Sequence, residues 1–197
     1  AGEHELSKEW YLKRAQAGGW EEEVFYSMYR VGICNCILER PWNEIQDAFL
    51  QAWSYRPCRA EPLWQLSRLY RQNGNPRLAY LFAKQGLGFE FPEQDILFIA
   101  HDIWDWQLLD EIAATAFYLH KFEEGLAACN LLLRNPRFPK EHHERTRENV
   151  NHYTNAIKEQ NEQRLELEKK TDKLRKSESQ VEDIRPKTYK KRKKQKN

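Results

Sequence analysis

The segment from Ala60 to Pro92 has the pattern of two antiparallel helices that pack closely. Counted from Ala60 as position 1, large apolar residues recur at helical spacing and small residues stand at positions 8 and 20. Small residues let two helix axes approach, and the "NGN" between the halves tolerates the left-handed backbone of a turn. The pattern consists of Leu63, Leu66, Ser67, Tyr70, Gly74, Ala79, Ala83, Leu87 and Pro92. Residues 60–93 are therefore predicted to form a helical hairpin, whose apolar faces need a neighbour to cover them.

The same pattern recurs on both sides of this hairpin. Similar copies occupy residues 21–59 and 106–139, and residues 2–17 have the pattern of a second helix alone. The third copy is delayed by "QDILFIAHDIWD", a stretch apolar enough that we expect it to pack against the helices. Stacked hairpins of this kind predict an all-α, right-handed solenoid. Because the first helix lacks its partner, we expect that partner upstream of Ala1, in a longer polypeptide.

These copies resemble the tetratricopeptide repeat (TPR) family over residues 2–139. A narrower similarity is carried by "RAQAGGWEEEVFYSMY" (14–29), "PWNEIQDAFLQAW" with "RPCRAEPL" (41–63), "RLAYLFA" (77–83) and "WDWQLLDEIA" (104–113). These phrases resemble the TPR segments found beside bacterial sugar-transferring domains, including family-2-like glycosyltransferases. The resemblance implies a glycosyltransferase domain elsewhere in the intact polypeptide, and it brings no catalytic motif into these residues.

The C-terminal part differs in composition from the repeats. Residues 140–177 place a few apolar side chains at helical spacing on an otherwise polar segment, which is typical of a capping helix that continues as a projecting polar helix. The apolar positions are Val150, Tyr153, Ala156 and Ile157. Residues 178–197 are predicted to be a disordered basic tail.

The tail accounts for the basic character of the chain. The formal net charge is +2, and the last thirteen residues hold eight Lys or Arg and no acid, so the remainder carries 2 − 8 = −6. The tail's core is Lys190, Lys191, Arg192, Lys193 and Lys194. Such a cluster is compatible with a nuclear-import signal, contact with nucleic-acid phosphates, contact with an anionic membrane surface, or solubilising charge.

The sequence contains no motif of an enzyme or of a cofactor site. The phosphate-binding glycine motifs and the GxSxG of hydrolases are missing. Asp102 and Asp105 are spaced wrongly for a metal-binding DxD, and Asp105 is predicted to cap a helix. His142 and His143 are adjacent, so they cannot converge on one metal, and we expect them in a solvated first turn. We predict no metal and no cofactor.

The cysteines and the start of the chain bear on its compartment. Four cysteines, at 34, 36, 58 and 129, lack zinc-ligand spacing and are expected to be reduced thiols. No membrane-spanning stretch and no apolar signal core are present. These features predict a cytoplasmic location, or a nuclear one if the tail is an import signal.

A concave groove is the predicted binding site. In this repeat, positions 2, 5, 9 and 12 of the first helix line the concave surface, and aromatic rings beside arginines suit an extended acidic peptide. The predicted groove residues are Glu23, Tyr26, Arg30, Glu61, Trp64, Arg68, Arg71, Asp110 and Phe117. The alternative is that Tyr26 and Trp64 only complete the packing between repeats.

The sequence therefore supports three functional hypotheses. The first is a non-enzymatic protein-interaction module that binds a partner peptide or protein in its groove. The second is an accessory TPR region of a glycosyltransferase, and the third is a nucleic-acid-associated adaptor that acts through the tail.

Overall fold

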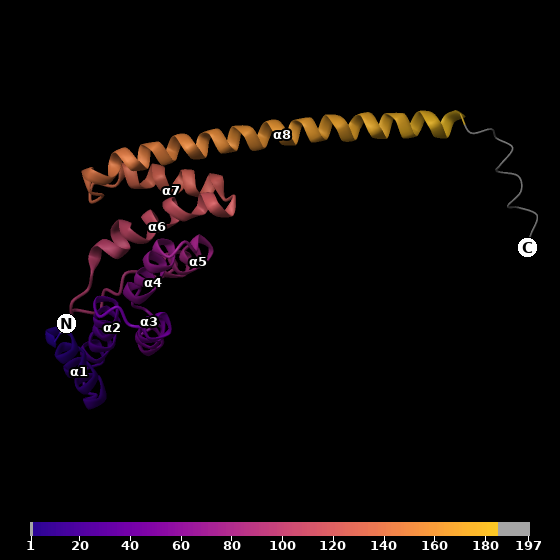
Figure 1. Ribbon diagram of the computed structural model, residues 1–197. Coiled ribbons are helices and arrows are strands. Elements are labelled where there is room, and N and C mark those ends of the chain that lie inside the picture. Colours follow the sequence, from indigo (N-terminus) through magenta and orange to yellow (C-terminus); the bar gives the residue numbers. More distant parts are fainter. Residues whose placement is uncertain (1, 185–197) are drawn as a thin grey trace, which may run out of the picture. The chain divides into compact units, whose positions relative to one another are not determined.

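The structure is a computed structural model, and it describes the backbone of residues 2–184 and the side chains as far as residue 175 (Figure 1). Every regular element within 2–184 is helical and none is a strand, which confirms the predicted all-α class. The α-helices are α1 (Gly2–Ala17), α2 (Glu21–Ile37), α3 (Trp42–Tyr55), α4 (Glu61–Gln72), α5 (Pro76–Leu87), α6 (Leu108–Thr115), α7 (Phe122–Arg134) and α8 (His143–Ile184), and the short helical turns are η1 (Ile103–Gln107), η2 (Ala116–Leu119) and η3 (Lys140–His142). The chain divides into two units, residues 1–154 and residues 155–197, with the boundary inside α8.

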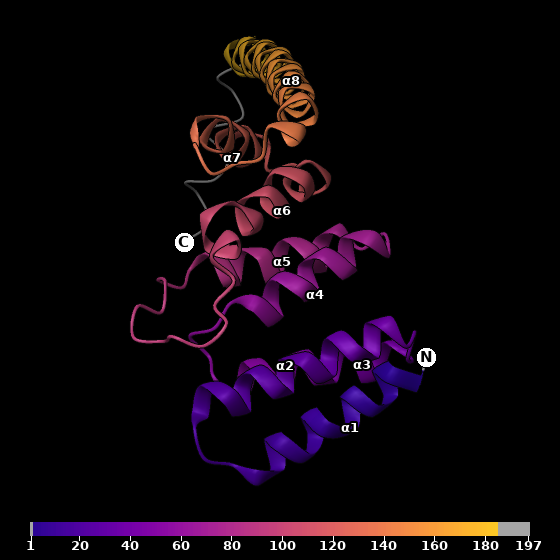
Figure 2. The same cartoon turned by 90° about the vertical axis from the view of Figure 1, so that its left-hand side faces the viewer.

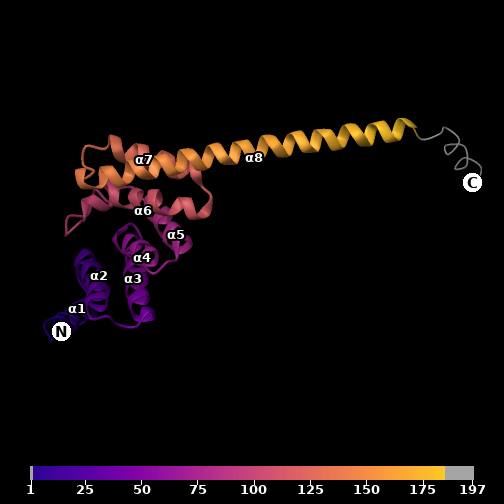
Figure 3. The same cartoon turned by 45° about the horizontal axis from the view of Figure 1, so that its top comes forward.

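In the first unit, helices that follow one another in the sequence are neighbours in space from α1 to α7 (Figures 2 and 3). The turn between α4 and α5 shows why the chain folds back at this point. Gly74 has a φ of 73°, a left-handed conformation that glycine adopts without strain. Asn75 then caps α5 by accepting a hydrogen bond from the backbone N–H of Leu78 at 3.2 Å, and Pro76 begins the helix.

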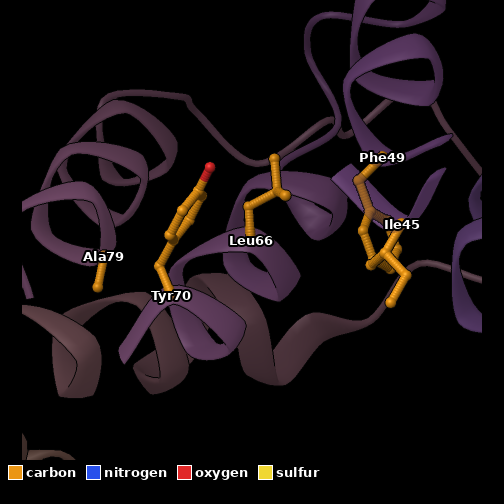
Figure 4. Close-up of a cluster of buried hydrophobic side chains, with 5 residues drawn as sticks. All are labelled: Ile45, Phe49, Leu66, Tyr70 and Ala79. Atoms are coloured by element: carbon orange, nitrogen blue, oxygen red, sulfur yellow. The ribbon is translucent and has the colours of Figure 1, made fainter. Parts of the chain in front are cut away.

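An apolar cluster joins three consecutive helices. Ile45 and Phe49 come from α3, Leu66 and Tyr70 from α4, and Ala79 from α5 (Figure 4). Burial of each large apolar side chain stabilises a fold by about 1.5–3 kcal/mol. Clusters that span neighbouring helices therefore hold each hairpin to the next.

Glycines allow the closest approaches between neighbouring helices. A Cβ atom on Gly32 would lie 2.6 Å from the ring of Phe49, and one on Gly86 would lie 2.8 Å from Leu108. At Gly125 in α7 the corresponding distance, to Cζ of Tyr153, is only 2.1 Å. These three contacts therefore depend on positions without a side chain.

The segment between α5 and η1, residues 88–102, is attached by both polar and aromatic contacts. The stretch "QDILFIAHDIWD" is predicted to pack against the helices, and only part of it does: Ile103 is 2% exposed in a buried cluster with Ala60 and Leu108, whereas Ile96 and Phe98 are 79% and 64% exposed. The carboxylate of Glu22 instead accepts hydrogen bonds from the backbone N–H groups of Ile96 and Leu97, both at 2.7 Å. Figure 2 shows this segment standing out from the helices.

A buried ion cluster completes the attachment of this segment. Asp95 accepts hydrogen bonds from Arg56, at 2.8 and 2.5 Å, and from Arg59 at 3.2 Å. Arg59 is 1% exposed and also donates to Glu61 at 2.5 Å. The cluster ties the 88–102 segment to the short connection between α3 and α4.

Acid is expected to weaken this attachment. Hydrogen bonding from Arg56, followed by that from Arg59, lowers the pKa of Asp95 below its usual value, although burial opposes the shift. A carboxylate with a lowered folded-state pKa contributes stability above its unfolded pKa of about 3.9, and this contribution is lost as the pH falls through the folded value. We expect the urea unfolding free energy to fall as the pH drops below about 3.9 toward the lowered pKa of Asp95.

Asp95→Asn is the control for this pH dependence. The variant should be less stable than the natural chain near neutral pH, and its urea unfolding free energy should change less between pH 5 and pH 2. Parallel curves for the two proteins would contradict the role of Asp95.

The surroundings of η1 and η3 correct two predictions. Asp105 does not cap a helix; it lies inside η1, a π-helical turn, and its carboxylate pairs with Arg137 at 2.5 Å. His142 and His143 are not a solvated turn, because both are partly buried against Phe138, with ring centroids 5.9 and 5.4 Å apart.

The beginning of α8 and its continuation are described separately. In the first unit, the buried Tyr153 accepts a hydrogen bond from the backbone N–H of Phe117 at 2.9 Å and donates one to the carbonyl of Ala113 at 3.0 Å. In the second unit α8 continues as a polar helix as far as Ile184, so the predicted disordered tail begins too early at residue 178. The predicted cluster from Lys190 to Lys194 lies outside the described residues.

Candidate partner-binding face

Two arginines on neighbouring helices form the candidate site. Arg30 of α2 and Arg68 of α4 are half-buried, and neither has a carboxylate partner among residues 2–175. Seven other arginines of that range form ion pairs with Asp or Glu, and these are Arg14, Arg40, Arg56, Arg59, Arg71, Arg137 and Arg145. We call the surface of α2 and α4 around these two guanidinium groups the arginine face.

A hydrogen-bond chain connects the two helices at this face. Gln65 donates from Nε2 to the hydroxyl of Tyr29 at 3.0 Å. The amide oxygen of Gln65 accepts from Nε and Nη2 of Arg68 at 3.3 and 3.0 Å. These hydrogen bonds fix the position of the Arg68 guanidinium. Its Nη1 group has no partner in the described structure.

Tyr29 lies within the electrostatic reach of both guanidinium groups. Burial raises the pKa of Tyr29 to about 12, although the hydrogen bond with Gln65 and the charges of Arg30 and Arg68 act to lower it. The phenol is therefore protonated at neutral pH. Its oxygen accepts from Gln65, and its own proton is free to be donated to a bound group.

Aromatic rings hold Arg30 in place. Its guanidinium lies over the rings of Tyr11 and Tyr26, at 5.4 and 5.8 Å, and donates to the Tyr26 hydroxyl at 3.1 Å. Nε of Arg30 is buried and has no hydrogen-bond partner in the described part of the chain. The Tyr26 ring in turn contacts Phe98, whose centroid is 4.5 Å away and whose φ is 47°.

Trp64 serves both the face and the core. Its ring packs against the buried cluster of Ala60, Ile103 and Leu108, and the Arg68 guanidinium lies 5.6 Å from its centroid. Trp64 therefore contributes to packing between helices, as the alternative interpretation of this residue predicts, and it also contacts Arg68.

Other predicted groove residues have their charges occupied within the chain. Glu23 pairs with Arg14 at 2.6 Å, and this hydrogen bond lowers the pKa of Glu23. Arg71 pairs with the buried Glu111 at 2.8 Å. Asp110 pairs with Arg145 at 2.9 Å. These residues can border a bound partner, but they are not unpaired charges that attract one.

Two predicted groove residues lie elsewhere. Glu61 is 1% exposed and bonded to Arg59, so its assignment to an open groove is wrong. Phe117 contacts Phe122 and Tyr153, with ring centroids 5.3 and 5.6 Å away, and lines a separate pocket of about 330 Å³.

Comparison with known proteins gives no assignment. No family model, curated protein or solved structure matches this chain. The resemblance to TPR segments therefore remains a prediction from the sequence, as do the association with a glycosyltransferase domain and nucleic-acid binding by the tail.

The described part of the chain contains neither a helix suited to span a membrane nor a cluster of metal-binding side chains. None of the helices within residues 2–184 combines the length and apolar character that a bilayer span requires. Over the described side chains, no three His, Cys, Asp or Glu residues gather closely enough to hold a metal ion.

Sequence reasoning missed Tyr29, Gln65 and Phe98. Tyr29 would occupy position 8 of its predicted repeat, which corresponds to Ser67 in the predicted repeat that begins at Ala60. A large polar ring at a position where the pattern expects a small residue is a signal that could have identified it.

Proposed function

We propose that this chain is a TPR-like scaffold that binds an acidic segment of a partner protein on the arginine face. The repeat part of this proposal is supported by the contact between positions 8 and 20 of the repeat that begins at Ala60. Ser67 and Ala79 are both fully buried, and the Ser67 hydroxyl donates to the Ala79 carbonyl at 2.8 Å. The binding part rests on one observation, the two half-buried arginines without acidic partners.

The chemistry of the face favours a carboxylate ligand. Guanidinium groups form short, charge-assisted hydrogen bonds to carboxylates, often through two parallel N–H donors. Arg68 is positioned by Gln65 and Arg30 by two tyrosine rings, so little conformational entropy is lost when a ligand binds. Partial burial also strengthens the attraction relative to that of a fully solvated charge.

Neighbouring rings supply contact area for an apolar residue beside the acid. Tyr26 and Trp64 each lie next to one of the two arginines, and both side chains are half-buried rather than buried. Aromatic side chains provide large contacts with few rotatable bonds. We therefore expect the partner to be an extended segment in which acidic and apolar residues alternate.

Charge reversal at the face tests this function. The full chain is titrated into a fluorescein-labelled peptide of alternating Glu and Leu, and binding is followed by fluorescence anisotropy. Arg30→Glu and Arg68→Glu are each expected to weaken binding by at least about tenfold, because each replaces an attraction by a repulsion.

Two controls make the result specific. Arg77→Glu makes the same charge change at an exposed position on α5 and should leave the affinity nearly unchanged. A peptide with Gln in place of Glu should bind much more weakly than the acidic one. Equal binding of both peptides, or equal effects of Arg68→Glu and Arg77→Glu, would reject the proposal, provided that thermal unfolding shows all variants folded.

A further inference from the structure

A further pocket is lined by five residues, none of which belongs to the arginine face. Its volume is about 500 Å³, within the size range of small-molecule sites. Three different segments contribute to it, which are the 88–102 segment, η1 and the connection after α7. The lining residues are Phe91, His101, Trp104, Asp105 and Arg137.

The pocket is built on a π-helical turn. The backbone N–H of Leu108 bonds to the carbonyl of Ile103, five residues earlier, which gives η1 a wider turn than an α-helix. Such turns are rare and less favourable than α-helix, and they occur frequently at functional sites. The side chain of Asn135 holds this turn by donating to the Asp105 carbonyl at 2.6 Å.

Aromatic rings form the apolar side of the pocket. The ring of His101 stacks on Phe91 with a centroid distance of 4.8 Å and an interplanar angle of 25°. Trp104 meets Phe91 at 77°, with a centroid distance of 5.5 Å. The pocket is therefore lined by aromatic rings in two nearly perpendicular orientations, which suits contact with a rigid ligand.

An ion pair forms the polar side. Nη1 of Arg137 donates to Oδ1 of Asp105 at 2.5 Å, and the Arg137 side chain is 67% exposed. Within the described residues, Oδ2 of Asp105 and the remaining guanidinium N–H groups of Arg137 have no bonded partner. The pocket therefore offers an acceptor and a donor side by side, with no net charge from the pair.

We propose that this pocket binds a neutral pyranose sugar. The C–H face of the sugar would pack on the aromatic rings of the pocket, and neighbouring hydroxyl groups would donate to Asp105 and accept from Arg137. Arg137 disfavours a cationic ligand such as a methylated ammonium group, and Asp105 disfavours an anionic one. A hydroxyl pair both donates and accepts, so it matches the two sides of the ion pair without leaving a buried polar group unpaired.

NMR titration of the full chain tests the proposal. The probes are the methyl pyranosides of glucose, galactose, mannose and N-acetylglucosamine, each added separately to the ¹⁵N-labelled protein. The indole N–H signal of Trp104 is assigned from the signal that Trp104→Phe removes, because the chain has seven tryptophans. At least one pyranoside is expected to shift this signal in a saturable way.

Surface variants separate a sugar site from a general effect. Arg137 and His101 are exposed residues. Arg137→Ala and His101→Ala are each expected to raise the dissociation constant of the sugar at least about tenfold. Arg134→Ala, which removes the same charge at the exposed end of α7, should leave it unchanged. Arg68→Glu should also leave it unchanged, so failure of this proposal and failure of the arginine face are distinguishable.

Three outcomes would overturn the proposal. The first is that no pyranoside shifts the Trp104 signal. The second is that choline or adenosine shifts it while the sugars do not, which would assign the pocket to a cation or a nucleobase. The third is that Arg137→Ala and Arg134→Ala have the same effect on sugar binding.

Discussion

Gly125→Ala is expected to destabilise the fold by about 3 kcal/mol or more, through overpacking and the loss of a buried hydrogen bond. A Cβ atom at this position would lie 2.1 Å from Cζ and 2.4 Å from the hydroxyl oxygen of Tyr153. The Tyr153 ring is 1% exposed, so it cannot move aside without leaving the core. Displacing it would also free the backbone N–H of Phe117 and the carbonyl of Ala113.

Urea unfolding followed by circular dichroism measures this effect. Gly88→Ala is the matched control, because Gly88 has an ordinary φ of −77° and a Cβ there would meet nothing closer than 3.4 Å. Gly125→Ala combined with Tyr153→Leu should lose less stability than the sum of the two single changes, since the smaller side chain relieves the clash. Strict additivity would contradict the close contact.

Arg59→Met is expected to cost about 3–5 kcal/mol, because it leaves the buried Glu61 without its cation and removes one of the two cations that pair with Asp95. Arg59 bonds to Glu61 at 2.5 and 2.9 Å and to Asp95 at 3.2 Å, and all three side chains are buried. Its guanidinium also lies 4.6 Å from the ring of Phe25. Arg59→Lys should recover only part of the loss, because an ammonium group lacks the forked donors that serve two carboxylates.

The unfolding free energy and the rate of proteolysis within residues 88–102 measure this effect. Arg56→Gln is the comparison, since Arg56 is less buried than Arg59 and one of its partners, Glu21, is mostly exposed. Arg56→Gln should therefore cost clearly less than Arg59→Met. Equal losses would show that burial of the Arg59 cluster does not control the attachment.

The helices could be predicted because their apolar periodicity is local. Gly74 and Asn75 mark the turn between α4 and α5, and the structure uses both for that purpose. The sequence also shows that large and small residues exchange positions between α2 and α4, and only the structure explains this exchange. Position 8 is Ser67 in α4 and Tyr29 in α2, while position 11 is Tyr70 in α4 and Gly32 in α2.

The size exchange has a physical reason. Gly32 leaves space for the Phe49 ring. The larger Tyr29 side chain reaches α4, where its hydroxyl accepts a hydrogen bond from Gln65. The predicted repeat pattern assigns one residue size to each position. It therefore does not predict that α2 has its large residue at position 8 and its small one at position 11, whereas α4 has the reverse.

The site was less predictable because ion pairs join segments that no periodicity relates. Position 2 of the repeat pattern placed Glu61 on an open surface, but Arg59, two residues earlier, buries it together with Asp95. Arg30 and Arg68 were identified correctly as neighbours of aromatic rings, but their lack of acidic partners follows only from the positions of the other carboxylates. The π-helical turn of η1 has no sequence pattern that distinguishes it from an ordinary helix.

The hold of Glu22 on Ile96 and Leu97 also has a kinetic consequence. Glu22 is 74 positions from Ile96 and 75 positions from Leu97 in the sequence. Among the hydrogen bonds of the described residues, these two span the longest sequence separations. Most other contacts of the first unit join consecutive helices and so have low contact order, which favours fast folding from any hairpin. The Glu22 contact must close a much larger loop, so we expect it to form late, after α2 to α5 have assembled.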